Sequence, residues 1–172
     1  MKRIVITGAE CTGKSTIAQA LSGYYGEPWT VEFVRGYAAQ LSRELQQSDL
    51  DLIAKGQRAL EDEALPKASR FLIHDTNLLS SIIYANHYFD TSIEWVNETF
   101  LSREYSLYLF CQPDIPWNAD PGQRESVEAR RIIHHKFEAS LDRLQLPYVR
   151  IDGDELHRFS QAVTAIDALL SN

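Results

Sequence analysis

A short glycine-rich motif near the beginning of the sequence carries the residue types best suited to chemistry. Within the run GAECTGKS, Gly8, Gly13, Lys14 and Ser15 match the pattern G-x-x-x-x-G-K-[ST]. The two glycines let the backbone curl so that successive N–H groups point inward, at the positive end of the helix that follows. In this pattern the lysine ammonium reaches the β- and γ-phosphates, and the serine hydroxyl binds Mg²⁺. The sequence therefore predicts a cradle for the phosphates of ATP or a close relative.

The flanking residues favour a phosphate loop over a plain turn. An apolar run, RIVIT at residues 3–7, precedes the motif and is typical of a strand buried on both faces of a parallel sheet. A helix is predicted from residue 14 to about residue 24. The alternative, a glycine-rich turn with an exposed lysine, requires neither element. The loop residues predicted to contact the nucleotide are Gly8, Glu10, Cys11, Thr12, Gly13, Lys14, Ser15 and Thr16.

Carboxylates are expected at the ends of two further strands. Asp75 ends the apolar run FLIHD, where it can bind Mg²⁺ together with Ser15 or accept the proton of an attacking hydroxyl. Glu32 and Arg35 lie at the end of a strand predicted over residues 30–34. Glu32 is the alternative base or a ribose ligand, unless the two residues form only a solvated ion pair. The sequence leaves open whether Asp75 or Glu32 is the base.

A charged segment later in the chain suits a mobile lid over the phosphates. Residues 116–131 contain a Pro-Gly turn followed by Arg124, Arg130 and Arg131. A guanidinium group can donate two parallel hydrogen bonds to the oxygens of one phosphate, and it stabilises the negative charge that develops during phosphoryl transfer. We predict catalytic roles for Arg124 and Arg131. The alternative is an exposed helix whose arginines pair with Glu125 and Glu128.

The order of the predicted elements indicates one α/β domain over residues 1–172. Strands are predicted at 3–7, 30–34, 71–73, 107–111 and 148–151, and helices at 14–24, 37–46, 50–68, 78–89, 93–101, 123–144 and 155–170. Ser48 and Asp51 form a plausible capping box for the third helix. Strands alternating with helices predict a three-layer P-loop NTPase fold of the nucleoside-kinase kind, with a five-stranded parallel sheet and an arginine-bearing lid. Ligands then bind at the carboxyl ends of the strands.

Composition narrows the classes of partner. The net charge of −7 and pI near 5.2 argue against general binding to nucleic acid or to an anionic membrane. No apolar run approaches the roughly 18 residues needed to span a bilayer, and the opening MKRIVITG is unlike a signal peptide. Cys11 and Cys111 are expected to be reduced thiols. We therefore expect a cytoplasmic protein that binds nucleotides and small nucleoside-like molecules, and the oligomeric state is left open.

Taken together, these segments resemble the ribosylnicotinamide kinase domain of the NadR-type proteins, among the AAA-like P-loop ATPases. The resemblance covers almost the full length of the chain. This resemblance rests on the order and spacing of the matching segments more than on any single segment. The segments are GAECTGKST, VEFVRGYA (31–38), GQR (56–58), DTN (75–77), PWNADPGQR (116–124) and PYVRIDG (147–153).

The resemblance implies transfer of the γ-phosphate of ATP to the 5′-hydroxyl of nicotinamide riboside, a step of NAD salvage. It assigns Lys14 and Ser15 to ATP and Mg²⁺, Asp75 to the metal or the base, and Arg124 to the lid. The substrate contacts predicted on the same grounds are Glu32, Arg35, Arg58, Asn77 and Trp117.

Two departures from the family pattern bear on the acceptor. Asn77 stands where the family frequently has a second aspartate, and Val31 stands where some members have a tryptophan. They favour two alternatives: a kinase of another nucleoside or small alcohol, and an ATP-binding regulatory module with little catalysis.

Overall fold

A single five-stranded parallel sheet forms the centre of the molecule. The computed structural model describes residues 1–117 and 126–171, and the strands follow the order β2-β3-β1-β4-β5. Apolar runs form the three central strands, and almost all of their residues are buried. The predicted five-stranded sheet is confirmed. The strands are β1 (Lys2–Thr7), β2 (Trp29–Thr30), β3 (Phe71–Asp75), β4 (Leu107–Cys111) and β5 (Tyr148–Ile151).

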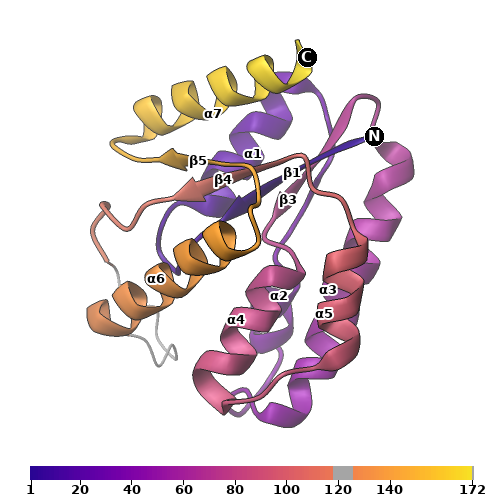
Figure 1. The fold of residues 1–172 in the computed structure, drawn as a ribbon, viewed down its shortest axis with the longest axis vertical. Coiled ribbons are helices and arrows are strands. Elements are labelled where there is room, and N and C mark those ends of the chain that lie inside the picture. The colour runs from indigo at the N-terminus through magenta and orange to yellow at the C-terminus, as the bar shows by residue number, and fades with distance from the viewer. Residues whose placement is uncertain (118–125, 172) are drawn as a thin grey trace.

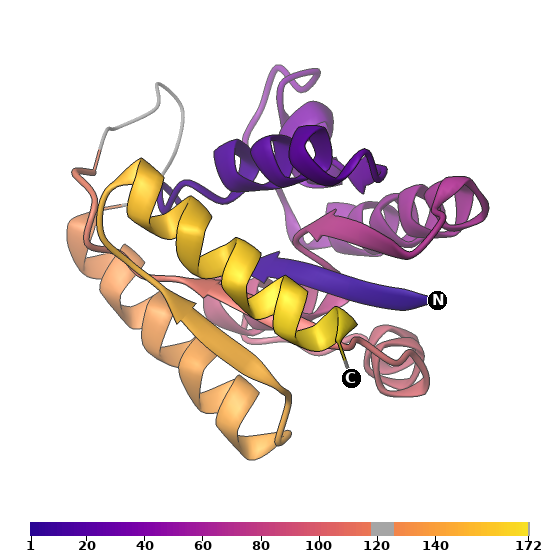
Figure 2. The same ribbon diagram turned by 90° about the horizontal axis from the view of Figure 1, so that it is seen from above.

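Helices cover both faces of the sheet and complete the three layers. They are α1 (Lys14–Tyr25), α2 (Phe33–Ala38), α3 (Leu50–Ala64), α4 (Leu78–Phe89), α5 (Glu94–Ser102), α6 (Val127–Arg143) and α7 (Glu155–Leu170). Helices α1 and α7 lie together on one face, and the other face is covered mainly by α4 and α6 (Figures 1 and 2). The three-layer α/β arrangement predicted from the sequence is therefore confirmed.

Each face of the sheet has its own apolar core. Successive side chains of a strand point to opposite faces, so Val5 packs with α4, α5 and α6 while Ile4 and Ile6 pack with α1 and α7. Strand β1 pairs in parallel with both β3 and β4, which brings the ends of these strands to one edge. The phosphate motif follows β1 directly and therefore lies at that edge.

The segment after β2 differs from the prediction. The predicted strand over 30–34 is limited to Trp29–Thr30, and the helix predicted over 37–46 is replaced by α2, which begins at Phe33 and ends at Ala38. The backbone N–H of Phe33 donates to Gln57 Oε1 at 3.0 Å, and its ring packs so closely on Gly56 that a Cβ there would approach Phe33 Cζ to 2.3 Å. These contacts with α3 override the alternating pattern of the local sequence.

The capping box predicted at Ser48 and Asp51 is also wrong. A 3₁₀ turn over Gln47–Asp49 precedes α3, and the box is formed instead by the side chains of Gln46 and Asp49. Asp49 further accepts hydrogen bonds from Arg43, at 2.7 and 2.8 Å, which hold the pKa of the carboxyl well below its usual range. This buried carboxylate therefore fixes the connection between α2 and α3.

Two expectations from composition can be compared with the structure. None of the helices in residues 1–117 and 126–171 has both the length and the apolar character that a bilayer crossing demands. In the same ranges Cys11 and Cys111 form no disulfide, as predicted. Burial raises the pKa of the Cys111 thiol to about 12, so this side chain stays protonated and is a poor nucleophile.

Candidate active site at the phosphate loop

The glycines of the motif are required by the backbone path. Gly8 has φ 137° and Gly13 has φ 78°, conformations that residues with a side chain rarely adopt. A Cβ at Gly8 would lie 2.7 Å from the carbonyl oxygen of Cys111, at the end of the neighbouring strand β4. Cys11, between the glycines, also has a positive φ, of 51°. The loop therefore follows a tight, left-handed path between β1 and α1.

Lys14, the first residue of α1, points back over the loop. Its ammonium donates to the carbonyl oxygen of Ala9 at 2.7 Å, and the hydroxyl of Thr12 donates to the same oxygen at 2.8 Å. The lysine is buried although it carries a full charge. A buried cation held at the start of a helix is a favourable partner for phosphate, because the helix dipole adds to its field.

Ser15 and Asp75 meet at the mouth of the loop. The serine hydroxyl donates to Asp75 Oδ2 at 2.5 Å, although the two residues are sixty positions apart in the chain. Asp75 is 2% exposed, and within the described residues its Oδ1 has no hydrogen-bond partner. The same is true of the hydroxyls of Thr7 and Thr76, which lie at or next to the ends of β1 and β3. Buried oxygens without partners mark a place for a ligand, and oxygen ligands suit Mg²⁺.

A strained residue follows Asp75. Thr76 has φ 68°, which is exceptional for a β-branched side chain, and its backbone N–H donates to the carbonyl of Ile6 at 3.0 Å. Strain of this kind persists where the surrounding structure holds it, often beside a site of chemistry. Here it turns the chain abruptly from β3 into α4 and leaves the Asp75 carboxylate at the sheet edge.

Asn77 has a structural place in the protein interior. It is fully buried, and its Oδ1 caps α4 by accepting from the N–H of Leu79 at 3.1 Å. Its Nδ2 donates to the hydroxyl of Tyr108 at 3.1 Å. The amide at position 77 therefore has two structural partners: its oxygen caps α4, and its nitrogen donates a hydrogen bond to a buried tyrosine. A contact between Asn77 and substrate stays a prediction.

Glu32 and Arg35 lie on the outer side of the site. Glu32 is not at a strand end but is the residue that precedes α2, and Arg35 follows one turn later. Their side chains form an ion pair of 3.5 Å, in which Arg35 is 66% exposed and Glu32 is 15% exposed. The pair is therefore exposed to water on the arginine side only, and roles in substrate binding or as the base stay predictions.

Two other residues predicted to bind substrate, Arg58 and Trp117, make no described contact with the phosphate loop. The Arg58 guanidinium lies 5.2 Å from the centre of the Trp95 ring, a packing contact between α3 and α5. Trp117 is partly buried, and its indole N–H has no hydrogen-bond partner within the described residues. Their substrate roles stay predictions.

The two neighbouring arginines of α6 have different surroundings. Arg131 pairs at the surface with Glu128, at 2.7 Å, which is the alternative considered for the lid arginines. Arg130 is buried and donates to the carbonyl oxygens of Cys11 at 3.3 Å and Ile115 at 3.1 Å. Arg124 lies outside the described residues, so its place in a lid is not described. Of the two lid arginines within the described residues, Arg130 is the one that the structure brings to the loop.

Sequence reasoning missed Arg158, which also reaches the loop. Its Nη1 donates to the carbonyl oxygen of Thr12 at 3.0 Å, and it forms an ion pair with Asp114. One signal in the sequence could have identified it. Arg158 lies four residues before Ala162 and eight before Ile166, on the buried stripe of α7, where a lone arginine is out of place unless it has buried partners.

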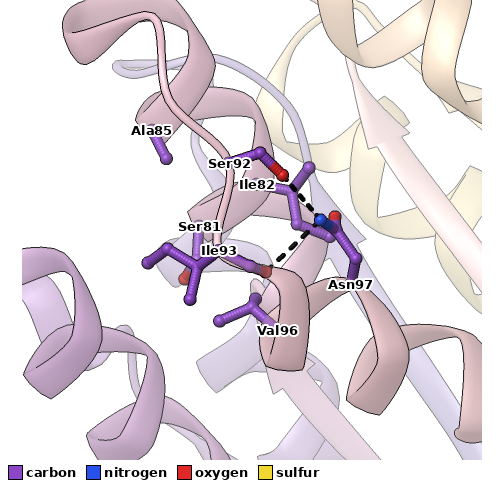
Figure 3. A pocket seen from close by; sticks show the side chains of 7 residues that line it. All are labelled: Ser81, Ile82, Ala85, Ser92, Ile93, Val96 and Asn97. Atoms are coloured by element: carbon purple, nitrogen blue, oxygen red, sulfur yellow. Dashed lines mark hydrogen bonds between the residues drawn. The ribbon is translucent and has the colours of Figure 1, made fainter.

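Two hollows differ in their relation to the loop. One of about 210 Å³ opens beside the first turns of α1 and α7 and is lined by Thr16, Ile17, Ala20, Glu155, Leu156 and Phe159. The other lies between α4 and α5, where Asn97 bonds to Ser92 and to the Ile93 carbonyl (Figure 3). Its volume of about 10 Å³ has room for no more than one water molecule. Only the hollow beside α1 is therefore large enough to extend the candidate site.

Comparison with known proteins agrees with this geometry. A family model described as an AAA domain matches residues 3–158, which include the loop, Asp75 and Arg158. The chain is 24% identical over 177 aligned residues to the trifunctional NAD biosynthesis/regulator protein NadR of Escherichia coli (strain K12), and 26% identical to that of Salmonella typhimurium. Each match covers 99% of this chain and 43% of the relative, so the chain spans less than half of the length of these proteins. The resemblance predicted from the motifs is confirmed.

Solved structures show the same fold. A NadR protein in complex with NR superposes with a TM-score of 0.85 at 21% identity, covering 99% of this chain and 50% of that one. Deoxyadenosine kinase from M. mycoides gives a TM-score of 0.69 at 14% identity, with 96% of this chain and 99% of that one covered. Thymidylate kinase from Ehrlichia chaffeensis gives 0.64 at 16%, with 98% of each chain covered. The chain therefore has the fold of P-loop kinases.

Proposed function

The chain belongs to the AAA domain family, and from that premise we propose that it is an ATP-dependent kinase of a small nucleoside, with nicotinamide riboside as the acceptor. The contact between Ser15 and Asp75 carries the proposal. It places a hydroxyl and a carboxylate together beside a loop whose lysine is already buried and charged. A carboxylate at this place can bind the metal of a bound nucleotide and can also accept the proton of an attacking hydroxyl, which are the two tasks that phosphoryl transfer requires.

Phosphoryl transfer assigns a task to each of these side chains. The bond between the γ-phosphorus and the oxygen that bridges to the β-phosphate breaks, and a new bond forms to the acceptor hydroxyl oxygen. The Lys14 ammonium and the loop N–H groups hold the phosphates and stabilise the negative charge that accumulates. ADP leaves with the bridging oxygen.

The hydroxyl proton moves to a carboxylate of the protein. Asp75 is the first candidate, because its Oδ1 has no hydrogen-bond partner within the described residues. Glu32 is the alternative, from the outer side of the site. Mg²⁺, when bound, neutralises phosphate charge and orients the phosphates, and Ser15 and Asp75 are the residues that would hold it.

The choice of nicotinamide riboside is supported by the relatives. A NadR protein has been solved with NR, and another structure of NadR contains NAD and AMP-PNP. A kinase of another nucleoside is the second candidate. It is favoured by the likeness to deoxyadenosine kinase and by Val31, which is exposed and lacks the flat ring that some relatives have there.

An acceptor screen tests the proposal. Purified protein is incubated with ATP, Mg²⁺ and, separately, nicotinamide riboside, adenosine, deoxyadenosine, cytidine and thymidine, and the products are followed by mass spectrometry. We expect a monophosphate of nicotinamide riboside, and no product from the Asp75→Asn variant. Phosphorylation of a different nucleoside alone would favour the second candidate. ATP binding with no phosphorylated product from any acceptor would contradict a kinase and favour a regulatory module.

A further inference from the structure

We propose that Arg158, together with Arg130, is a positioning residue that sets the phosphate loop from outside. Each arginine holds a carbonyl group of the loop so that the next backbone N–H is directed toward the phosphates. The inference deepens the phosphate-binding role proposed above and rests on it.

The Arg158 guanidinium joins three segments at the edge of the sheet. It is 3% exposed and lies in the first turn of α7. Nη1 donates to the carbonyl of Thr12 in the loop at 3.0 Å, Nη2 to that of Gln112 after β4 at 3.0 Å, and Nε to that of Gly153 before α7 at 2.7 Å. The planar, rigid fork of arginine makes these three contacts in fixed relative directions. The loop is thereby attached to two neighbouring connections of the sheet.

Holding the Thr12 carbonyl determines where the following N–H points. In a trans peptide the C=O and the N–H lie in one plane and point in opposite directions. No cis peptide bond occurs in the described residues. When Arg158 holds the Thr12 oxygen on one side of the loop, the N–H of Gly13 is directed to the other side. The next residue, Gly13, has φ 78°. Because it has no side chain, the peptide between Thr12 and Gly13 can take this orientation without a steric clash.

Arg130 acts in the same way on the preceding peptide. It donates to the carbonyl of Cys11 at 3.3 Å, which directs the N–H of Thr12 away from this arginine. It also donates to the carbonyl of Ile115 at 3.1 Å, so it is itself anchored beyond the loop. The two arginines come from α6 and α7, which pack on opposite faces of the sheet (Figure 1). Two consecutive peptide planes of the loop are thus held from two sides.

A structural ion pair alone does not account for the burial of Arg158. Its carboxylate partner, Asp114, has a side chain that is 39% exposed, so a pair of these two charges could form at the surface. Removing a guanidinium from water is strongly unfavourable unless its N–H groups form hydrogen bonds inside the protein. Here three carbonyl groups satisfy them, and one belongs to the phosphate loop.

The arginines also gather charge around the loop. Lys14, Arg130 and Arg158 are all buried there, in a chain whose net charge is −7. The ion pair with Asp114 offsets part of the Arg158 charge, and the remaining positive charge attracts a polyphosphate. Arg158 therefore favours polyphosphate mainly by orienting N–H donors, and its partly paired charge adds to the attraction.

The test measures binding of Mg·ATP and of inorganic tripolyphosphate by calorimetry, in wild type, Arg158→Met and Arg158→Lys. Tripolyphosphate reports on the loop without a base or ribose. We expect Arg158→Met to weaken both probes about tenfold, since a misdirected donor loses one charge-assisted hydrogen bond. Arg158→Lys should weaken them about threefold, because a single ammonium cannot reproduce a three-way fork. The matched control is Arg150→Met, an exposed arginine of β5 that pairs with Glu138, which should leave both affinities unchanged.

The affinity of the folded variant for the two probes distinguishes a residue that positions the phosphate loop from one that only stabilises the fold. A structural role would lower the melting temperature of Arg158→Met and leave the affinities for both probes at the wild-type values, which would overturn the inference. If Arg158→Met does not fold, a folded Arg158→Lys protein with wild-type affinity would overturn it equally. Wild-type protein that binds neither probe would contradict the proposed function itself. Equal weakening of ATP and tripolyphosphate, without a change in the control, supports the inference.

Discussion

The side of the site proposed for phosphate and the side proposed for the acceptor are built in different ways. On the phosphate side, Lys14, Asp75, Arg130 and Arg158 are buried and bonded to the ends of the central strands and the loop. On the side proposed for the acceptor, α2 is a short helix that follows Glu32, and in the ion pair between Glu32 and Arg35 the arginine is exposed while the glutamate is largely covered. The difference indicates that the residues proposed to bind phosphate belong to the protein core, whereas those proposed to bind the acceptor lie at its periphery. Changes on the two sides should therefore have separable effects.

Asp75→Asn should produce the largest effect on turnover. The amide keeps the shape of the side chain but removes the charge that would bind Mg²⁺ or accept the proton. We expect kcat to fall about 10²- to 10⁴-fold, as for the loss of a catalytic acid or base. The affinity for ATP should change much less, because Lys14 and the loop remain. Steady-state kinetics and calorimetry measure the two quantities, and an unchanged kcat would remove Asp75 from the mechanism.

Gly8→Ala should disrupt the phosphate side through its backbone. The added Cβ would lie 2.7 Å from the Cys111 carbonyl oxygen, in a conformation with φ 137°. We expect a loss of stability of about 1–3 kcal/mol or more, together with weaker nucleotide binding. Gly23→Ala is the matched control, since nothing lies within 4 Å of a Cβ there and the residue is inside α1. It should stabilise the protein by about 0.5–1 kcal/mol in chemical denaturation. Similar effects of Gly8→Ala and Gly23→Ala on stability and nucleotide binding would contradict a special backbone requirement at Gly8.

The pH dependence of stability tests the environment of the core, because two buried groups there have pKa values shifted in opposite directions. Burial raises the pKa of Glu61 from 4.5 to about 7, and burial, helped by the charges of Arg3 and Arg103, lowers the pKa of His74 from 6.5 to about 3. Between pH 4.5 and 6.5 folded Glu61 keeps a proton that the unfolded chain has lost, so its contribution to stability falls as pH rises. Folded His74 lacks a proton that the unfolded chain holds, so its contribution rises with pH.

The two contributions should nearly cancel in the wild-type protein, and one substitution should reveal the other. Glu61→Gln should make stability increase with pH between 4.5 and 6.5 by about 1.4 kcal/mol per pH unit more steeply than in wild type. Urea denaturation at several pH values measures this slope. The same slope in variant and wild type would contradict the shift of Glu61.

Changes on the acceptor side should have the smallest effect on the fold. Arg35→Ala should alter stability by about 0 to 1 kcal/mol, because the Arg35 side chain is 66% exposed and water screens its charge. If these residues bind the acceptor, Glu32→Gln should raise the KM for nicotinamide riboside about tenfold, the equivalent of one charged hydrogen bond. The KM for ATP should stay the same. A Glu32→Gln protein that loses ATP binding instead would break the separation between the two sides.

Much of the fold could be predicted from local patterns. The strands β4 and β5 and the helices α4 and α7 have the predicted bounds, because apolar runs and helix caps such as Asp154 mark them clearly. The phosphate loop was equally visible, since its spacing reflects a backbone requirement. Residues 30–46 were mispredicted because Phe33 follows its contacts with Gln57 and Gly56, which are distant in sequence.

The limits on predicting the site have the same origin. A sequence indicates that arginines are present but not which of two neighbours turns inward. Arg130 and Arg131 differ in their surroundings because Arg130 lies on the buried side of α6 and Arg131 on the exposed side. Arg158 escaped notice because its partners are backbone carbonyls, which every residue possesses.

Nucleotide binding by Lys14→Ala tests the central claim most directly. The claim is that the loop from Gly8 to Ser15 grips a polyphosphate with its N–H groups and the Lys14 ammonium. Calorimetric titration with Mg·ATP should give a clear binding isotherm for the wild-type protein. The folded variant should bind at least about a hundredfold more weakly, as expected for loss of a buried charged partner worth about 3 kcal/mol or more. A Lys14→Ala protein that binds ATP as tightly as wild type would contradict this account.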